Sequence, residues 1–543
     1  MARTPVGRML NGLVALDRES RRTGIPPDEL DDMRAERSPG GPPVGRRDFL
    51  RKAAKSGAAL AAAPALAAAL AACSKRSSEG QPEIVIVGAG LSGMTAAFRL
   101  MKAGHRSTIY EAADRLTGRS WTLRNFFDNG QYVEHGGEFI NSDHKAIIDL
   151  ATIELLLDLD DLWVPWPAHT QSIYHFNGRR YDRHQAFLDY QQVHPALRRD
   201  LHAAPWPPLW DKPHSKEEQR LDNMSLEEWI DKNVPGGLRS DFGKLVAVAY
   251  TGEYALDPGD QSALNLMYEM GYSPKSRMQL YGDQDYRFQI EGGNDQVVTE
   301  IAKKLPEGST VLESPLVAIT KNSDDTVTCT FDQSGSTVDV KADKVILCLP
   351  FRTLQNVDFS KAGFEPLKVR CINEFGMGTN AKVHMQFGKR FWYGQGNNGV
   401  TLSDTGYEST WEEDMGKLKG PGTLVSYTGG SAGTSFGDSA PHAATPEEIS
   451  GRVLGQLDPV FPGAKQRWNG KSYLDYWAKD PWHFGSYACY KPGQWTEFLG
   501  YQKVPQGNIH FAGEHTSVEW QGFLNGAVES GNRAAREIID SIG

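Results

Sequence analysis

The chain has 543 residues, enough for two or three domains and a large core, so it is not a small binding module. Its hydrophobic share of 39% and charged share of 23% are those of a folded protein rather than a disordered or fibrous one. Residues 1–80 hold 14 Lys or Arg against 9 Asp or Glu, a net charge of +5, which leaves −15 for the remaining residues. An acidic body argues against nucleic acid as a partner and mildly favours a cationic substrate.

The first 82 residues resemble an export signal and linker rather than part of a fold. The adjacent pair Arg46-Arg47 is followed by a hydrophobic residue and then by an Ala-rich run, residues 57–72, that ends at Cys73. This order resembles a twin-arginine signal, which implies the Tat translocase as a partner and a periplasmic or other extracytoplasmic location. Residues 70–73 also resemble a lipobox, so we expect either a lipid anchor on Cys73 or simple cleavage nearby. The run is too short and too rich in Ala to predict a membrane span.

The other cysteines give no sign of a metal site or a disulfide framework. Cys329, Cys348, Cys371 and Cys489 are scattered without the spacing of metal ligands, and we predict no metal. Cys348 lies in an apolar, strand-like run over residues 344–350 and is predicted to belong to the core.

A nucleotide-binding motif follows the linker. Residues 83–87 are predicted to form a short buried strand, and the GxGxxG sequence Gly88-Ala-Gly90-Leu-Ser-Gly93 leads into a stretch, residues 94–103, that is compatible with a helix. Gly88 permits the tight turn, Gly90 lets a pyrophosphate approach the backbone, and Gly93 lets helix and strand pack closely. The helix N-terminus, with Ser92, is then expected to face the phosphates.

A second predicted strand, residues 107–110, ends in Glu111, where a carboxylate can accept hydrogen bonds from ribose hydroxyls. The motif from the first strand to Glu111 does not distinguish an NAD-binding protein from an FAD-binding one. The stretch from Glu111 to Arg119 resembles the one by which the flavin amine oxidase family extends its Rossmann unit, with Arg119 beside the pyrophosphate and flavin. Thr117 departs from the Gly that the family usually has there. The turn Gly136-Gly137-Glu138 resembles the family's turn near the isoalloxazine ring.

The C-terminal part of the chain carries the other half of the resemblance. Residues 508–516 are predicted to form a strand that enters a turn at Gly513-Glu514, and residues 521–531 open a helix that runs to the C-terminus. In the family this block closes over the cofactor: the Glu binds the ribityl or pyrophosphate part, and the helix N-terminus, here Phe523-Leu524, points at flavin N1 and C2. Residues 314–317, around Leu316, resemble the strand that contacts adenine. The agreement extends from about residue 83 to 540 and implies FAD.

The family resemblance also assigns three catalytic positions. Lys382 matches the Lys that is bonded through water to flavin N5. Tyr487 and Phe523 match the two aromatic residues that hold the substrate nitrogen over the flavin, although the family commonly has Tyr or Trp in place of Phe523. In animal monoamine oxidases a Cys at the position of Ser486 carries the covalent flavin link, so this chain is predicted to hold FAD noncovalently.

The resemblance implies an FAD-dependent oxidase. It would transfer a hydride from the carbon that bears nitrogen, in a primary amine or an L-amino acid, to flavin N5 and give an imine, then an aldehyde or keto acid with ammonia, and hydrogen peroxide from O2. Many L-amino acid oxidases place an Arg for the substrate carboxylate shortly after the Gly-rich turn, where this chain has Glu138-Phe139-Ile140, so both substrate classes remain open. The stretch from Leu150 to Tyr281 is expected to build much of the pocket.

Two alternatives keep the same fold: a desaturase- or isomerase-like oxidoreductase, and a catalytically silent flavin-binding protein. Desaturases and isomerases of this fold lack the paired aromatic positions that this chain has. A silent flavin-binding protein would require loss of Lys382, Tyr487 or Phe523. An NAD-dependent dehydrogenase is disfavoured by the C-terminal block.

The predicted architecture is α/β, with a Rossmann-type FAD-binding domain and a discontinuous α+β substrate domain, as in the amine oxidase fold. The FAD-binding domain is assigned to residues 83–145, 286–355 and 476–543, and the substrate-binding domain to residues 146–285 and 356–475. Oligomeric state cannot be read from the sequence.

Overall fold

The computed structural model describes residues 81–163, 165–413 and 420–542. The twin-arginine signal and Cys73 therefore lie outside the described residues, and their roles stay predictions. Residues from Glu83 onward belong to one compact unit. Within the described part of the chain, no helix is both long enough and apolar enough to cross a membrane.

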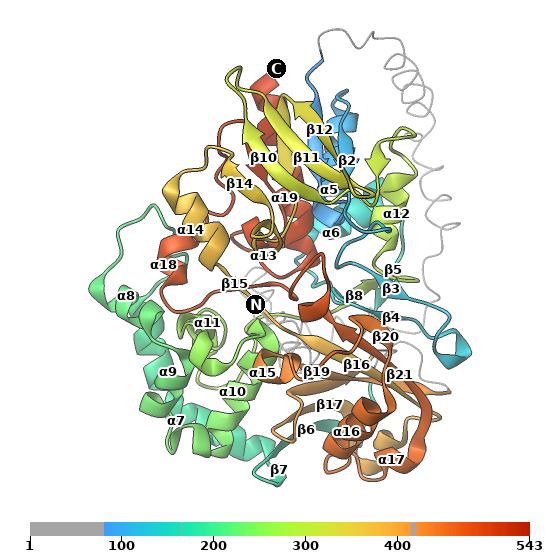
Figure 1. Ribbon diagram of the computed structural model, residues 1–543. Helices are drawn as coiled ribbons and strands as arrows, with labels where there is room; N and C mark the ends of the chain where they lie inside the picture. The colour runs from blue at the N-terminus through green and yellow to red at the C-terminus, as the bar shows by residue number, and fades with distance from the viewer. Residues whose placement is uncertain (1–80, 164, 414–419, 543) are drawn as a thin grey trace, which may run out of the picture. The chain divides into compact units, whose positions relative to one another are not determined.

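A five-stranded parallel sheet forms the base of the upper half of Figure 1, where α5 (Leu91–Lys102) packs against the C-terminal helix α19 (Leu524–Ile542). The central strand, β1, has the sequence IVIV and is buried along its whole length, as expected for a parallel strand covered on both faces. The strand order is β23-β13-β1-β2-β9. The strands are β1 (Ile84–Val87), β2 (Thr108–Tyr110), β9 (Thr310–Val311), β13 (Lys344–Leu347) and β23 (Ile509–Phe511).

Helix α5 begins three residues before the predicted stretch, because Gly90 is its N-cap in an extended conformation. Ser92 and Gly93 therefore lie in the first turn of the helix. A Cβ atom on Gly93 would lie 2.0 Å from the Gly88 carbonyl oxygen, so only glycine lets helix and loop approach this closely. The predicted role of Gly93 in packing thus has a direct geometric basis.

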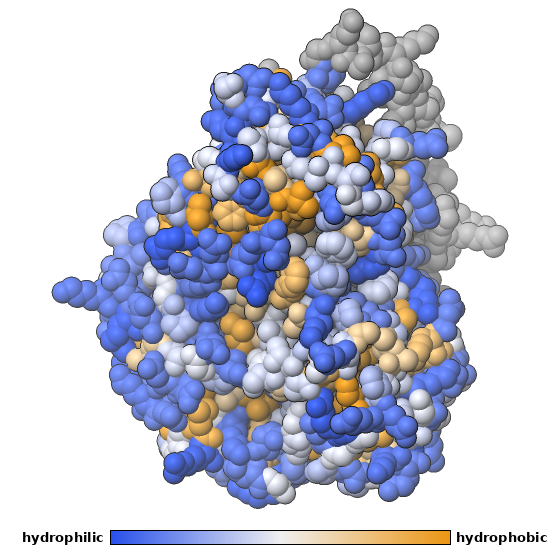
Figure 2. All heavy atoms as spheres, in the orientation of Figure 1, coloured by the Kyte–Doolittle hydropathy of each residue, from blue (hydrophilic) through white to orange (hydrophobic). Residues whose placement is uncertain are grey.

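A second sheet lies over the first in the upper half of Figure 1. It has the strand order β12-β11-β10-β14, in which β10, β11 and β12 are antiparallel neighbours and β14 pairs with β10 in parallel. Figure 2 shows a mainly hydrophilic surface with an apolar band where Figure 1 places β14 and α14. The elements are β10 (Leu316–Lys321), β11 (Val327–Gln333), β12 (Ser336–Ala342), β14 (Asp358–Lys361) and α14 (Pro366–Glu374).

An eight-stranded sheet, mostly antiparallel, fills the lower half of Figure 1, with the order β20-β21-β16-β19-β18-β17-β6-β7. Its strand β16 (Ala381–Phe387) is buried on both faces and divides them by chemistry. Ala381, Val383, Met385 and Phe387 belong to an apolar cluster with α16 (Glu447–Leu457). Lys382, His384 and Gln386 point the opposite way, because successive side chains alternate across a strand. The other strands are β6 (Gln171–Phe176), β7 (Arg179–Tyr181), β17 (Asn397–Ser403), β18 (Ser409–Glu412), β19 (Gly422–Thr428), β20 (His442–Ala444) and β21 (Trp468–Tyr476).

A group of helices lies beside this sheet, at the lower left of Figure 1. Ser215 and Ser225 each form a capping box with a Glu three residues later, which explains two sharp helix starts close together in sequence. Helix α10 packs against β6, β17, β18 and β19. The helices are α7 (Arg183–Ala203), α8 (Lys216–Asn223), α9 (Leu226–Asn233), α10 (Asp241–Tyr254) and α11 (Leu264–Met267).

Three two-stranded sheets and several short helices join the larger parts. The pair of β3 (Thr122–Leu123) and β4 (Val133–Glu134) leads into the turn at Gly136-Gly137. In the pair of β15 (Gly376–Met377) and β22 (Ala488–Cys489), β22 directly follows Tyr487. The third pair is β5 (Leu159–Asp161) with β8 (Phe288–Ile290). The short helices are α6 (Lys145–Asp149), α12 (Gln296–Ala302), α13 (Phe351–Leu354), α15 (Gly430–Gly433), α17 (Ala464–Arg467) and α18 (Gln494–Phe498).

The predicted α/β fold with a Rossmann-type sheet is confirmed. All five strands of the parallel sheet come from the three segments assigned to the FAD-binding domain, and the eight-stranded sheet comes from the other segments apart from its last residue, Tyr476. The exact boundaries of the two predicted domains stay a prediction.

Candidate active site

A cavity of about 560 Å³ runs from the GxGxxG loop to the eight-stranded sheet. The residues that line it fall within four ranges of the chain: 87–139, 286–357, 380–427 and 477–527. None of the described residues between 140 and 285 lines it. The prediction that Leu150–Tyr281 builds much of the pocket is therefore wrong. In its described residues, that segment forms three strands and a group of helices, of which α10 supports Tyr487 through the Gly252 and Glu253 carbonyls.

The phosphate end of the cavity is formed where β1 meets α5. Gly88 adopts a φ of +102°, which favours glycine, and Gly90 has no atom closer than 3.9 Å to where a Cβ would stand. Gly88, Gly90 and Ser92 line the cavity, whereas Gly93 packs behind them. The predicted core residue Cys348 is only partly buried and lines the cavity beside Gly88, because the strand β13 ends one residue earlier.

Glu111 lines the cavity at the end of β2 and fixes the glycine loop. Its two carboxylate oxygens accept hydrogen bonds from the Ala89 amide at 2.7 Å and the Ala113 amide at 2.9 Å. Leu316 lines the same end of the cavity. A carboxylate held in this way at a parallel strand's carboxyl end suits a ribose hydroxyl.

The middle of the cavity is held together by Glu514 and Arg119. Arg119 donates hydrogen bonds to Glu514 at 3.0 Å and to the Ser486 carbonyl at 2.7 Å. Glu514 also accepts hydrogen bonds from the Gly522 amide at 2.6 Å and the Ala488 amide at 3.2 Å. The main contacts of Glu514 are thus to protein groups, and its predicted contact with the ribityl or pyrophosphate part stays a prediction.

The other predicted cofactor-binding glycines stand where a larger residue would clash or be strained. A Cβ on Gly136 would lie 2.1 Å from the Arg119 carbonyl oxygen, and one on Gly137 would lie 2.6 Å from a methyl group of Leu524. Gly513 has a φ of +119°. Gly136, Gly137, Gly513, Phe523 and Leu524 all line the cavity, with the latter two at the start of α19.

These residues fit FAD. The cavity offers the N-terminus of α5 for a pyrophosphate, a carboxylate for a ribose and the N-terminus of α19 for the electron-rich end of a reduced flavin. Ser486 carries no thiol, and its hydroxyl donates to Asn380 at 2.7 Å. The one cysteine that lines the cavity, among the residues that the structure describes, is Cys348 at the phosphate end. Noncovalent binding of FAD stays a prediction.

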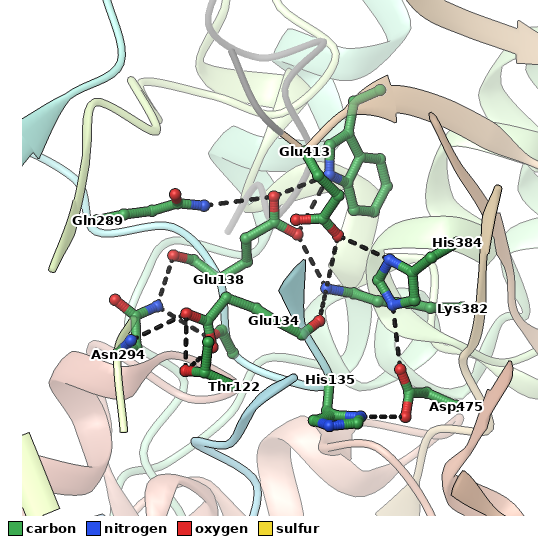
Figure 3. A network of polar contacts seen from close by, with 12 residues as sticks. Thr122, Glu134, His135, Glu138, Gln289, Asn294, Lys382, His384, Glu413 and Asp475 are labelled. Carbon is green, nitrogen blue, oxygen red and sulfur yellow. Dashed lines mark hydrogen bonds and ion pairs between the residues drawn. The ribbon is translucent and has the colours of Figure 1, made fainter. Parts of the chain in front are cut away.

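Lys382 lies at the inner end of the cavity among three glutamates (Figure 3). Its Nζ donates to the Glu134 carbonyl at 2.8 Å and to the Glu138 carboxylate at 2.8 Å, and it lies 3.9 Å from Glu413. Burial would lower the pKa of Lys382, but the carboxylates of Glu138 and Glu413 outweigh burial and raise it. Lys382 is therefore a fixed cation.

Glu138 is the carboxyl group that faces the cavity here. Burial raises its pKa, the Glu413 carboxylate raises it further, and Lys382 and Trp411 offset only part of this, so the pKa is about 8. Burial would also raise the pKa of Glu413, but Lys382 and His384 outweigh burial and lower it. Two carboxyl groups thus share one ammonium group, and Glu138 is the one that takes up a proton near neutral pH.

Aromatic side chains form the walls beside Lys382. Tyr487 and Phe523 both line the cavity, as do Trp411 and Tyr427, whose rings meet edge to face with centroids 5.1 Å apart. The Tyr487 hydroxyl lies 2.9 Å from that of Tyr427, which fixes the two rings. Trp411 donates from its indole to Glu138 at 2.9 Å.

Sequence reasoning missed Trp411, Tyr427, Glu413 and the polar residues behind Lys382. One signal was available: Lys382, His384 and Gln386 alternate with apolar residues in a short strand, which indicates a buried polar face. The partners on that face come from β18, β19 and β21, and their pairing is not visible in sequence.

His135, His442 and Asp475 bring a ring nitrogen each and a carboxylate oxygen within 4.8 Å of one another. The two Nδ1 atoms lie 2.5 and 2.7 Å from the same Asp475 oxygen, distances of hydrogen bonds between the residues themselves. This geometry gives no reason to assign a metal, and the absence of a metal site stays a prediction.

The glycine loop at the phosphate end, the cavity of about 560 Å³ and the C-terminal helix that closes it are those of a dinucleotide-binding protein with the parallel sheet of a Rossmann unit. A sequence profile described as flavin containing amine oxidoreductase matches residues 91–539. The chain belongs to this family, and it is an FAD-dependent oxidoreductase.

Relatives carry several activities. The chain is 24% identical over 489 residues to an L-amino acid dehydrogenase of Synechocystis, covering 86% of this chain and 97% of that protein. It is 27% identical over 471 residues to a putative flavin-containing monoamine oxidase of Mycobacterium tuberculosis, covering 84% and 96%.

Two solved structures share the fold. Putrescine oxidase bound to putrescine has a TM-score of 0.70 at 22% identity, and cyclohexylamine oxidase of Brevibacterium oxydans has a TM-score of 0.71 at 22% identity. In both comparisons 85% of this chain and 99% of the other are covered.

Proposed function

We propose that this chain is an FAD-dependent oxidase of primary amines that produces an aldehyde, ammonia and hydrogen peroxide. One observation carries the choice of amines over amino acids. Arg119 and Lys382 are the Arg and Lys side chains among the described residues that line the cavity, and both are already bonded to carboxylates. An amino acid would bring its own carboxylate into a chamber with no cation left for it.

Each part of the cavity can be given one role in the proposed reaction. Bound FAD supplies the two-electron acceptor for the carbon beside the nitrogen. The rings of Tyr487 and Phe523 and the neighbouring Tyr427 exclude water and hold the amine, and aromatic faces tolerate an ammonium group better than aliphatic walls do. Glu138 faces the same space, and in its ionised form, which prevails above its pKa of about 8, it can take a proton from the ammonium group, which must be neutral before a hydride can leave.

The test is a substrate panel on the FAD-loaded protein: putrescine, benzylamine, L-leucine and L-lysine, with peroxide and flavin bleaching as readouts. We expect bleaching and peroxide with an amine, and a loss of at least about 100-fold in the Lys382→Met variant. Bleaching by an L-amino acid alone would refute the amine assignment. No bleaching by any compound would favour the silent or desaturase-like alternatives. Bleaching without peroxide would identify a dehydrogenase that uses another electron acceptor.

We also propose that the chain is exported through the Tat translocase and anchored by lipid on Cys73. The support is the order of the Arg pair, the Ala-rich run and the lipobox-like residues in the sequence. Replacing Arg46 and Arg47 by Lys should retain the protein in the cytoplasm. Cys73→Ala should release it from the membrane fraction without blocking export, and retention in that fraction would contradict the anchor.

A further inference from the structure

His483 lines the cavity and has no part in the reaction proposed above. Among the described residues that line the cavity, two are histidines, His135 and His483. The side chain of His135 is fully buried, whereas 10% of the His483 side chain is exposed. The imidazole of His483 is therefore the one that reaches the space of the cavity, and its place there needs an explanation.

The His483 ring is held with its Nε2 atom toward the glycine loop. Its Nδ1 lies 2.7 Å from Asp480 Oδ1, and its ring meets that of Trp477 edge to face, with centroids 5.2 Å apart. The other ring nitrogen, Nε2, lies 3.8 Å from where a Cβ on Gly118 would stand. The same Cβ would lie 3.2 Å from the Cα of Gly90, the glycine at which a pyrophosphate is expected to approach the backbone. Nε2 therefore faces the place where a phosphate would lie.

Asp480 fixes the proton on the far side of this imidazole. Its Oδ1 also accepts a hydrogen bond from the Trp482 amide at 2.8 Å, and its Oδ2 lies 3.0 Å from His442 Nε2. Burial would raise the pKa of Asp480, but the hydrogen bonds to His442 and His483 outweigh burial and lower it. Asp480 is thus a carboxylate, so His483 keeps a proton on Nδ1 and donates it to Asp480. A neutral His483 then has a bare Nε2, which can only accept a hydrogen bond.

The phosphate end of the cavity is short of positive charge. Glu111 and Glu514 line it, and Arg119, which lies between them and Ser486, is already bonded to Glu514. Two carboxylates and one guanidinium group leave one net negative charge before the two charges of a pyrophosphate are added. The N-terminus of α5 offsets only about half an elementary charge. Lys382 lies at the opposite end and is paired with a carboxylate there.

We propose that His483 binds the pyrophosphate of FAD through Nε2, and that FAD binding brings one proton from the solvent onto this nitrogen. The imidazolium group then donates its Nδ1–H to Asp480 and its Nε2–H to a phosphate oxygen, so that its charge lies between two anions. Asp480 touches no cofactor atom, and it acts by orienting and stabilising the imidazolium group. The proposal needs bound FAD and does not depend on which substrate is oxidised.

The charged groups around His483 set the pH range of this proton uptake. Burial lowers the pKa of His483, the Asp480 carboxylate offsets only part of this, and Arg119 and Arg115 lower the pKa further. Before FAD binds, His483 is therefore neutral at pH 7, and a pyrophosphate beside Nε2 raises its pKa. The groups that face His483 or its immediate partners are Asp480, Arg115, Arg119, Glu111, Asp114, Glu514, His442 and Asp475.

The first test is the pH dependence of FAD affinity, measured on the holoenzyme. FAD-loaded protein is diluted to equilibrium at a series of pH values, and the fluorescence of released FAD gives Kd. The variants are His483→Gln and Asp480→Asn, and circular dichroism verifies that each is folded, with His483→Asn as the substitute for a variant that is not. His510→Gln is the matched control, because His510 is also buried with its Nδ1 2.8 Å from a carboxylate, that of Glu537, but does not line the cavity.

In the wild type and in His510→Gln we expect Kd to rise with pH between pH 6.5 and pH 8, by up to about tenfold per unit, because one proton leaves with the cofactor. In His483→Gln we expect Kd to be at least about tenfold higher at pH 6.5 and to rise by less than about twofold per unit. Asp480→Asn should also raise Kd, because an amide does not stabilise the imidazolium group.

Two results would overturn the proposal. The same Kd in His483→Gln and the wild type at pH 6.5 would show that Nε2 does not bind the cofactor. A pH dependence that persists in His483→Gln, or that disappears in Glu138→Gln, would assign the proton to another group. Glu138→Gln is included because Glu138 also titrates in this range, and it should leave the pH dependence unchanged.

A second readout needs no release of FAD. In ¹⁵N-histidine spectra of the loaded protein at pH 7.5, the signals of His483 are those that are lost when this residue is replaced. We expect both of its ring nitrogens to be protonated in the wild type, and Asp480→Asn to shift its titration to lower pH. A His483 ring with one bare nitrogen in the loaded protein would overturn the proposal, even where FAD binds too tightly to be released by dilution.

Discussion

The charge state of Glu138 can be tested through stability. Its folded pKa is about 8, against an ordinary value of 4.5, because burial and Glu413 disfavour the carboxylate. A raised pKa means that the folded state holds the proton between pH 4.5 and 8 while the unfolded state releases it. The contribution of Glu138 to stability is therefore fully present below pH 4.5 and is lost as the pH rises to 8. Glu138→Gln removes this dependence, since an amide stays neutral.

The expected magnitude follows from the shift. Each pH unit inside this window costs the wild type about 1.4 kcal/mol relative to Glu138→Gln, or about 2–3 kcal/mol between pH 5 and pH 7. With an unfolding entropy of about 2.1 cal/mol/K per residue, one kcal/mol corresponds to about 1 °C in Tm for a body of roughly 460 residues. The variant should therefore gain about 2–3 °C in Tm over the wild type between pH 5 and pH 7.

The assay compares Tm of the two FAD-loaded proteins at each pH, with free FAD in fixed excess so that cofactor binding contributes equally. Glu374→Gln is the control, because Glu374 is a half-exposed carboxylate on α14 that water screens. A Tm difference that stays constant or falls with rising pH would refute the reasoning, and would show that Glu138 is ionised throughout beside Lys382.

Four further outcomes follow from the geometry. Gly93→Ala should weaken FAD binding at least about tenfold in a fluorescence titration, since its Cβ would meet the Gly88 carbonyl oxygen at 2.0 Å; unchanged affinity would contradict the packing argument. Tyr487→Phe loses only the hydroxyl, which is bonded to the Tyr427 hydroxyl and to the Gly252 and Glu253 carbonyls, and should lower kcat/KM by less than about tenfold, whereas Tyr487→Leu should lower it more; equal losses would deny the ring a role. Acid precipitation should leave FAD in the supernatant, and a yellow pellet would disprove noncovalent binding. Burial lowers the pKa of Lys368 to about 7, so the folded state loses this proton above pH 7 and the unfolded state only near 10.5. The free energy of unfolding of the wild type should therefore rise with pH from 7 to 9 relative to Lys368→Met, by on the order of 1 kcal/mol per pH unit, and its Tm should rise with it; a parallel pH dependence of the two Tm values would contradict this.

Local motifs were predictable because their chemistry is contained in a few adjacent residues. The strand, the glycines Gly88 and Gly90 and the helix after them obey rules of turn geometry and phosphate binding that need no distant partner. The helix start was placed three residues late, since Gly90 caps the helix although glycine suggests a loop. Fold class followed from the order of such blocks.

The polar wall behind the cavity was not predictable. Glu413 and Asp475 meet Lys382 and His384 only because β18, β19, β16 and β21 pair in one register, and that pairing is decided by contacts between residues far apart in sequence. Residues 150–281 are rich in Trp, Pro and Asp, which suggested a pocket, but composition does not tell which face of a helix meets a cavity.

Glu514 sets a condition on when the cofactor can bind. This one carboxylate holds Arg119, from the first quarter of the chain, together with the amides of Ala488 and Gly522 near its end. Synthesis is vectorial, so the first part of the cavity leaves the ribosome long before the last part exists. Closure of the cavity by Glu514 therefore has to wait until synthesis has passed Gly522: a nascent chain that stops earlier has the glycine loop but lacks the last of these hydrogen bonds.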